Sequence, residues 1–330
     1  MMESVNVPAY TIHKFLKWNK ETGSFQMNEF NKVNEKIIIV DEASMIDIFL
    51  FSSLLKGLKS NVKIILVGDV NQLPSIGPGD LLNDLINLPT IKSKYLDTIY
   101  RVKEGSYITT LAKDIKEQKE FLYFSDYNDF KFIECRDEEI IPYLNEIVSK
   151  AIKKDIKVDN FQVLAPMYKG LNGIDNLNKN MSELFNKNED KYLIGDKYYK
   201  INDKVIQLVN DVENNVFNGD IGYITDIRNV DNKIFIDIDY IGNNVTYTST
   251  DSDKFNLAYA VSIHKSQGSE YDNVVVVLAK SFSRMFYNKL LYKAVTRAKK
   301  SLIILGSIDS FNKSVKTLYA TDRNTLMKNV

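Results

Sequence analysis

Two adjacent carboxylates follow a short apolar run near the start of the chain. Residues 37–40 (IIIV) lead directly into Asp41 and Glu42. An unalternating run of this length is typical of a strand buried on both faces of a parallel sheet, and such sheets bind ligands at the carboxyl ends of their strands. There, one acid can hold Mg²⁺ while its neighbour orients or deprotonates a water. By itself, however, an Asp-Glu pair at a strand end is more often only a solvated acidic pair.

A second apolar run, residues 64–67, strengthens the chemical interpretation. It leads into residues 68–79 (GDVNQLPSIGPG), a segment that is long, specific and hard to explain by packing alone. Gln72 lies beyond the end of the run, where a neutral amide can sense a terminal phosphate or a water. The alternative is a loop whose glutamine only caps a turn. Together with the two acids, the segment favours a site that handles phosphate.

The elements that must position these side chains follow an α/β order. Residues 45–58 predict a helix between the two strands, so strand, helix and strand fit within about 30 residues. The same order returns after residue 160, which predicts two similar α/β units. Further apolar runs of the same kind, each predicting a strand of a parallel sheet, are residues 162–166, 274–278 and 301–306.

Residues 190–256 have a different pattern. Apolar and polar residues alternate here, and Asn, Asp and Gly turns separate the alternating runs, as in a small antiparallel sheet or barrel inserted in the second unit. The predicted strands are residues 204–209, 222–227, 233–239 and 245–250. A shorter insertion at residues 18–34 contains a predicted hairpin.

Composition excludes several classes of protein. A length of 330 residues indicates about two domains. Lys+Arg and Asp+Glu are both 43, so the formal net charge is zero. This excludes a polybasic coat and leaves a local basic groove open. The single cysteine, Cys135, favours a reducing compartment. Because the chain shows no long apolar run and no signal-peptide pattern, we expect a cytoplasmic protein without a membrane partner.

Taken in order, the segments resemble the motifs of RecD-like superfamily-1 DNA helicases, the group that includes the exodeoxyribonuclease V alpha subunit. The match runs in order over nearly the whole chain. The matching segments are TIHKFL at 11–16, DEASM at 41–45, GDVNQLPSIGPG at 68–79, LDTIYR at 96–101, VLAPMYKG at 163–170, VFNGDIG at 216–222, IHKSQGSE at 263–270 and AVTRAK at 294–299.

The resemblance implies an α/β fold with two RecA-like parallel-sheet domains. The first, residues 1–105, is shortened at its N-terminal side and carries the hairpin insertion near 18–34, which aligns with the family's strand-separating pin. The second, residues 106–330, carries a small SH3-like β-barrel at about 190–256. The implied activity is ATP-dependent 5′-to-3′ movement on single-stranded DNA, with ATP and Mg²⁺ as cofactors.

The resemblance also implies a role for each nucleotide-binding residue. Asp41 is the expected Mg²⁺ ligand, and Glu42 is the expected general base for attack on the γ-phosphate. Gln72 would couple that phosphate to the DNA track. Arg101 and Arg297 would reach the phosphates, with Arg297 acting like an arginine finger; for each arginine the alternative is a surface ion pair.

The resemblance also implies roles for further residues of these motifs, some in binding the nucleotide and others in binding DNA. Gly268 and Glu270 would lie on the nucleotide side of their loop. The expected DNA contacts are His13, Met167, Lys169, His264 and Ser266. Core packing is the alternative for the aromatic residues nearby, because a single aromatic residue more often packs than stacks on a base.

One motif of the family, the phosphate-binding P-loop GxxxxGK[ST], is absent from the sequence. None of the fourteen glycines is followed by lysine. In addition, Val102 stands where the family usually has glutamine. Because a P-loop cradles the phosphates with backbone N–H groups and its lysine, we expect these 330 residues alone to hydrolyse ATP poorly or not at all. We also expect an uncovered edge or apolar face in the first domain.

Several explanations of the missing P-loop remain open. A truncated form, a shortened gene and a split protein whose partner supplies a P-loop-bearing segment all fit the sequence. Two alternative functions also remain. In the first, the chain is a non-catalytic single-stranded-DNA-binding remnant. In the second, it is a subunit of a helicase–nuclease complex.

Overall fold

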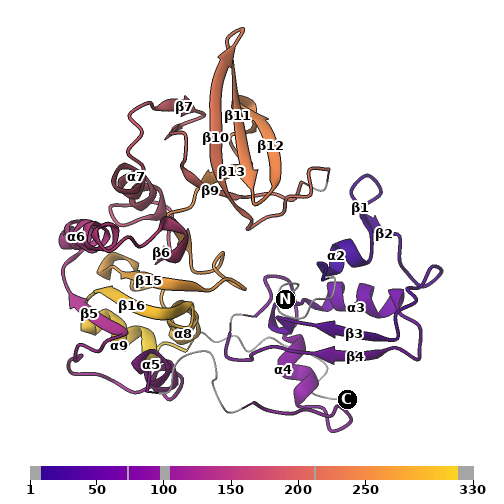
Figure 1. Cartoon of the computed structure of the whole chain (residues 1–330). Helices are drawn as coiled ribbons and strands as arrows, with labels where there is room; N and C mark the ends of the chain where they lie inside the picture. Colours follow the sequence, from indigo (N-terminus) through magenta and orange to yellow (C-terminus); the bar gives the residue numbers. More distant parts are fainter. Residues whose placement is uncertain (1–8, 73, 97–104, 212, 319–330) are drawn as a thin grey trace. The chain divides into compact units, whose positions relative to one another are not determined.

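The computed structural model describes residues 9–72, 74–96, 105–211 and 213–318 (Figure 1). These residues form two compact units, one within Met1–Asp97 and one within Thr98–Tyr319. Each unit is described by itself. The predicted domain boundary at 105/106 stays a prediction.

Unit 1 contains two parallel strands joined by a helix. Strands β3 (Ile37–Val40) and β4 (Lys63–Leu66) pair in parallel, and α3 (Ile48–Gly57) connects them. The strands are confirmed, but the helix begins later than the predicted residue 45. Asp47 caps it by accepting a hydrogen bond from the Leu50 N–H at 2.8 Å, and a 3₁₀ turn (Ala43–Met45) precedes it. A side-chain cap of this kind fixes where a helix starts.

The two faces of this small sheet differ. Ile38 and Ile64 pack against a core cluster that includes Leu54 and Leu81. On the other face the side chains are uncovered: Ile37 and Ile39 are each 59% exposed, and Ile65 is 38% exposed. The expected uncovered apolar face is therefore present in the described part of unit 1. Helix α4 (Leu81–Ile86) follows β4 and packs on the covered side.

A short helix and a hairpin precede β3. Helix α2 (Ile12–Phe15) begins at Thr11, whose hydroxyl accepts from the Lys14 N–H at 3.2 Å. Strands β1 (Trp18–Asn19) and β2 (Ser24–Phe25) form the hairpin, which confirms the prediction for residues 18–34. Gly23 has a φ of +59° at the turn, a conformation that glycine adopts without steric cost.

Unit 2 is built on a five-stranded parallel sheet in the order β14-β6-β15-β16-β5. Helices α6 and α7 cover one face, and α5, α8 and α9 cover the other (Figure 1). The bounds of the strands are β5 Phe130–Glu134, β6 Phe161–Ala165, β14 Ala260–Ser262, β15 Tyr271–Leu278 and β16 Ala298–Gly306. The helices are α5 Tyr107–Lys116, α6 Ile140–Lys153, α7 Ile174–Phe185, α8 Asn288–Val295 and α9 Ile308–Lys316. The three predicted runs after residue 160 are all strands of this sheet.

The predicted antiparallel insertion is confirmed. It leaves the parallel sheet after α7, returns at β14, and orders its own strands β12-β11-β10-β9-β13. At the β10–β11 turn, Asp231 and Asn232 both have positive φ, as a tight hairpin turn requires. The strands are β9 Lys204–Gln207, β10 Ile221–Val230, β11 Lys233–Tyr240, β12 Asn243–Thr248 and β13 Phe255–Leu257. A small hairpin of β7 (Tyr192–Ile194) and β8 (Lys197–Tyr199) comes first.

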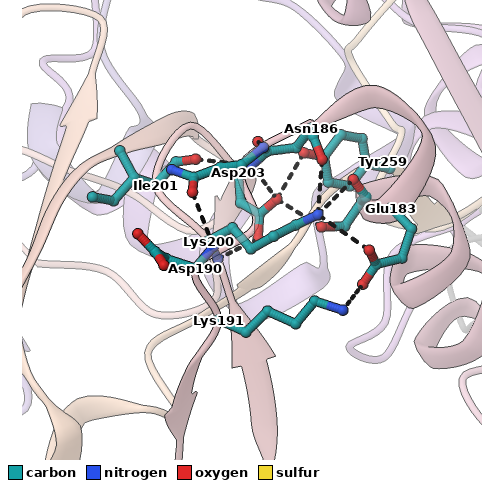
Figure 2. A network of polar contacts seen from close by, with 10 residues as sticks. Glu183, Asn186, Asp190, Lys191, Lys200, Ile201, Asp203 and Tyr259 are labelled. Carbon is teal, nitrogen blue, oxygen red and sulfur yellow. Dashed lines mark hydrogen bonds and ion pairs between the residues drawn. The ribbon is translucent and has the colours of Figure 1, made fainter.

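A buried polar network fixes the insertion to the parallel-sheet part of unit 2 (Figure 2). The Asp203 carboxylate is fully buried and accepts hydrogen bonds from Asn186 Nδ2 and the Tyr259 hydroxyl, each at 2.9 Å. Lys200, which is 3% exposed, donates to the Asn186 carbonyl at 2.8 Å. Since these residues come from α7 and from the chain entering and leaving the insertion, the network ties both connections to α7.

No helix in the described part of the chain combines the length and apolar character needed to cross a membrane.

Candidate functional site

The two acids of unit 1 lie where the sequence places them, at the carboxyl end of β3. Asp41 is exposed, and its Oδ1 accepts a hydrogen bond from the Glu42 N–H at 2.9 Å. Glu42 is half-buried and has φ 52° and ψ 40°, the left-handed conformation. A residue other than glycine in this conformation costs free energy, and such residues cluster at functional sites.

The loop after β4 packs directly on this turn. The Ala43 N–H donates to the Val67 carbonyl at 2.8 Å, and the Ile48 N–H donates to the Pro78 carbonyl at 3.0 Å. A Cβ on Gly68 would lie 3.1 Å from the backbone nitrogens of Ala43 and Ser44. Glycine at this position therefore lets the two strand ends approach each other closely.

Three polar oxygens at these strand ends are buried without a hydrogen-bond partner among the described residues. They are Glu42 Oε2, Ser44 Oγ and Gln72 Oε1, and Gln72 as a whole is 8% exposed. An unsatisfied buried polar atom costs about 1–3 kcal/mol, so several at one site are unusual for a purely structural turn. The structure thus places Asp41 and Glu42 at the end of β3 and Gln72 in the loop that follows the neighbouring strand β4, with unpartnered buried oxygens on Glu42 and Gln72.

The donor set fits Mg²⁺ held together with a phosphate group. Mg²⁺ usually binds one or two carboxylates and fills its remaining positions with water and phosphate oxygens. Asp41 offers an exposed carboxylate, and the Ser44 hydroxyl lies two residues beyond Glu42. The described residues contain no cluster of three or more His, Cys, Asp or Glu side chains that holds a metal by itself. Arg101, the other predicted phosphate contact in this part of the chain, lies outside the described residues.

In unit 2, the loop between β14 and β15 carries four of the predicted residues. His264 is exposed, whereas Ser266 is fully buried and its hydroxyl donates to the Ile263 carbonyl at 2.8 Å. Gly268 has a φ of +76° and is exposed. Glu270 forms an ion pair with Lys299 at 3.3 Å.

Arg297 lies against this loop. It follows α8, is 2% exposed, and donates from Nη1 to the Ser269 carbonyl at 2.9 Å. Its own carbonyl accepts from the Tyr271 N–H at 2.9 Å. Sequence reasoning places Arg297 at a phosphate; the structure holds its side chain among residues of the loop.

Two predicted DNA contacts follow β6. Met167 is half-buried, and its carbonyl accepts from the Ile174 N–H at the start of α7. The Lys169 side chain is 82% exposed and pairs with Asp175 at 3.0 Å. The hydrogen bond with that carboxylate raises the pKa of Lys169, so the side chain is a cation at neutral pH.

The remaining predicted contact, His13, is an exposed residue of α2 in unit 1. Its ring meets Trp18 edge-on at a centroid distance of 6.0 Å and lies 5.5 Å from Phe25. Trp18 and Phe25 are themselves 4.7 Å apart. The hairpin therefore forms an aromatic cluster with His13.

Two lysines near His264, Lys265 and Lys293, were not among the residues predicted from the sequence. Lys265 donates to Asn218 Oδ1 at 3.2 Å, which links the loop to the insertion. Lys293 of α8 is fully buried. The pKa of His264 is lowered, chiefly by desolvation and then by the positive charge of Lys293, because protein atoms crowd the imidazole although part of it is exposed. A lysine within the apolar stretch LLYKAV was the available signal for Lys293.

Comparison with protein families gives three matches along the chain. Residues 1–138 match an AAA domain, residues 177–238 match an ATP-dependent RecD-like DNA helicase SH3 domain, and residues 257–305 match a UvrD-like helicase C-terminal domain. The parallel sheet of unit 2 is RecA-like, and its antiparallel insertion is the SH3-like element.

Curated relatives agree with this assignment. The ATP-dependent RecD2 DNA helicase of Deinococcus radiodurans is 30% identical over 92% of this chain and 40% of its own length. A RecBCD enzyme subunit RecD from Buchnera aphidicola is 28% identical over 90% of this chain and 58% of its own length. The chain thus spans about half the length of the curated relatives it matches.

Solved structures support the fold alone, since their sequences are distant. The Pif1 helicase from Bacteroides, in complex with ADP-AlF3 and single-stranded DNA, has a TM-score of 0.55 and 18% identity over 94% of this chain and 82% of its own. The Pif1 helicase from Candida albicans has a TM-score of 0.50, also with 18% identity, over 86% of this chain and 74% of its own.

Proposed function

Because this chain belongs to the RecD-like family of superfamily-1 DNA helicases, we propose that it drives 5′-to-3′ movement along single-stranded DNA by ATP hydrolysis. The observation that carries the proposal is the group of buried, unpartnered oxygens at the ends of β3 and β4, among the described residues. At such a site Glu42 Oε2 and Gln72 Oε1 would accept hydrogen bonds from the attacking water or from waters on Mg²⁺, and the Ser44 hydroxyl would donate to a phosphate oxygen.

The chemistry follows from the side chains available in unit 1. When bound, Mg²⁺ neutralises charge on the phosphates of ATP, and Asp41 is the residue that holds it. Glu42 accepts the proton of the attacking water. Gln72, a neutral amide, donates from Nε2 to the γ-phosphate and so distinguishes ATP from ADP. The strained backbone at Glu42 presents its carboxylate at the strand end.

Arginines complete the charge stabilisation. We assign Arg297 and Arg101 to the phosphates, and Gly268 and Glu270 to the nucleotide side of the loop before β15. An arginine finger contributes about 10³–10⁵ in rate, or roughly 4–7 kcal/mol of barrier. Because Arg297 is buried against the Ser269 carbonyl, its use as a finger requires the loop to release it.

The DNA side is assigned to His13, Met167, Lys169, His264 and Ser266. Single-stranded DNA is bound by cations along its backbone and by flat faces on which bases stack. Exposed Lys169 supplies a cation, and the imidazole rings of His13 and His264 supply flat faces. Ser266 is buried and keeps the loop shape through its bond to Ile263, so we propose a backbone contact at this position.

Activity further requires a P-loop-bearing segment, on the same polypeptide or on a partner. Two observations support this requirement. The 330 residues contain no GxxxxGK[ST], and the apolar face formed by Ile37, Ile39 and Ile65 is uncovered. A strand and helix carrying the motif would bury that face and bring backbone N–H donors to the strand ends.

A second candidate is a subunit of a helicase–nuclease complex in the cytoplasm. It is favoured by relatives that are RecBCD enzyme subunits RecD. Co-purification with larger helicase and nuclease chains is the result expected in that case.

The test is ATP hydrolysis by the purified 330-residue chain, with and without oligo-dT and with and without a P-loop-bearing segment. We expect no turnover from the chain alone and DNA-stimulated turnover once the segment is present. Glu42→Gln should abolish that turnover. Glu35→Gln, the same change at the opposite end of β3, should leave it intact.

Each other outcome is informative. Turnover by the chain alone that Glu42→Gln abolishes means that another element cradles the phosphates. The chain is a non-catalytic DNA-binding remnant if ATP hydrolysis is absent even with the segment and if salt-sensitive DNA binding is unchanged by Glu42→Gln and Arg297→Ala.

A further inference from the structure

The buried Lys293 contacts the loop that carries His264. Helix α8 places Lys293 at 0% exposure. Its Nζ donates a short hydrogen bond to Oε1 of Gln267. Burying an ammonium group costs several kcal/mol after relaxation, whereas an apolar side chain of similar size has no such cost. A fully buried lysine on a helix therefore calls for a reason beyond packing.

The same helix leads directly to Arg297. The Thr296 hydroxyl donates to the Lys293 carbonyl at 3.0 Å, and the Arg297 N–H donates to the Ala294 carbonyl at 3.3 Å. One side-chain and one backbone hydrogen bond thus hold the end of α8 and Arg297 together. Lys293 and Arg297 are four residues apart in the sequence, little more than one helical turn.

The loop of residues 264–269 is also held together by its own backbone hydrogen bonds. The Gln267 N–H donates to the His264 carbonyl at 3.3 Å, and the Ser266 N–H donates to the Ser262 carbonyl at 3.1 Å. Two hydrogen bonds join helix α8 and the residues after it to this loop. Lys293 donates to Gln267, and Arg297 donates to the Ser269 carbonyl. Only the first involves a residue with no assigned role.

We propose that Lys293 is a positioning residue that joins the loop of residues 264–269 to Arg297, so that a contact of His264 with DNA changes the setting of Arg297. The inference rests on the proposed function for the roles of His264 and Arg297. It adds a physical link between them, the Lys293–Gln267 hydrogen bond, beside the direct bond of Arg297 to the Ser269 carbonyl.

The link has a readout that does not depend on ATP turnover. The chain has two histidines, His13 and His264, so their imidazole signals are easily resolved by NMR. Lys293 lowers the pKa of His264, with desolvation as the larger cause. Lys293→Met, which keeps the side-chain length, should therefore raise the pKa of His264 and leave that of His13 unchanged. Lys289→Met on the same helix is the control.

The coupling itself is measured with oligo-dT on the 330-residue chain. The chain has six arginines, and Arg297→Lys identifies the Arg297 Nε–H signal. In the wild type, oligo-dT should shift the signals of both His264 and Arg297. In Lys293→Met, the His264 shift should persist and the Arg297 shift should be lost.

A second pair of variants keeps the test valid if Lys293→Met does not fold. Gln267→Met removes the acceptor and should lose the Arg297 shift. Gln267→Glu keeps an acceptor oxygen and should retain it, which a loss of packing alone does not explain.

Two results overturn the inference while the proposed function stands. They are an unchanged pKa of His264 in Lys293→Met, and an Arg297 shift that persists in Lys293→Met and Gln267→Met. If oligo-dT shifts neither His264 nor Arg297 in the wild type, the proposed DNA contact fails, and the coupling that rests on it fails with it.

Discussion

At the scale of residues, unit 2 contains several charged side chains that are almost completely buried. Asp203 and Lys293 are fully buried, and Lys204 is 2% exposed. Such groups are tolerated only when hydrogen bonds replace the lost water. Asp203 has several donors, as Figure 2 shows. Lys204 donates to two neutral oxygens, the Val158 carbonyl at 3.2 Å and Gln162 Oε1 at 3.3 Å.

Lys204 predicts a pH dependence of stability. Desolvation lowers its pKa from 10.5 to about 8, and Asp159 only partly opposes this. Between these values the native state binds fewer protons than the unfolded chain, so stability rises as pH rises from about 8 to 10.5. Below pH 8 both states bind the proton, and the cost of burial is fully present.

Lys204→Met, which has no such charge, should therefore be more stable than the wild type at pH 7. The difference in free energy of unfolding should narrow by about 1–3 kcal/mol by pH 10.5. Urea unfolding at several pH values measures it, with the exposed Lys233→Met as a control. If the difference in free energy of unfolding between Lys204→Met and the wild type stays constant with pH, the Lys204 ammonium group reaches water.

At the scale of elements, the hairpin of β1 and β2 acts with α2. The ring contacts of His13, Trp18 and Phe25 hold the three together on the surface of unit 1. An isolated two-stranded hairpin is only marginally stable in water. The aromatic cluster therefore keeps the hairpin folded and presents flat faces to solvent.

Trp18 makes this element directly testable because it is the only tryptophan. It is 43% exposed. If bases stack beside His13, oligo-dT should quench Trp18 fluorescence, and His13→Ala should weaken the affinity about 5–150-fold, since one stacked base contributes roughly 1–3 kcal/mol. Tyr123→Ala removes an exposed aromatic of unit 2 and should leave quenching unchanged. If oligo-dT binds without changing Trp18 emission, the DNA lies elsewhere on the protein.

At the scale of the whole molecule, unit 1 and unit 2 differ in completeness. The unit 2 sheet has five parallel strands with helices on both faces (Figure 1). The parallel sheet of unit 1 has two strands in the described residues, with Ile37 and Ile39 uncovered. Parallel sheets are ordinarily covered on both faces.

Adjacent residues of β3 supply a matched pair of variants. Ile39→Lys, on the uncovered face, should change the free energy of unfolding by less than about 0.5 kcal/mol. It should also prevent a P-loop-bearing segment from restoring ATP hydrolysis. Ile38→Lys, on the face that packs on the core, should destabilise unit 1 by more than about 2 kcal/mol. Denaturant unfolding and the ATPase assay measure the two effects; full restoration in Ile39→Lys would mean that the segment docks elsewhere.

The sequence by itself determined the kind of each element and the family. Unalternating runs such as residues 37–40 became parallel strands, and the alternation within residues 190–256 became the antiparallel insertion. These patterns are local, because the period of the side chains along a strand is set by the backbone. The motif residues gave the family for the same reason, since they are read in order along the chain.

Only the tertiary structure decided the environment of each side chain. Ser266 and Arg297 were expected at ligands, but Ser266 is buried within its own loop, and Arg297, just after α8, is buried against that loop. Lys293 reaches Gln267 across 26 residues, and the Ser44 and Gln72 oxygens are buried without a partner after two different strands. Burial and hydrogen bonding depend on residues distant in sequence, so no local pattern contains them.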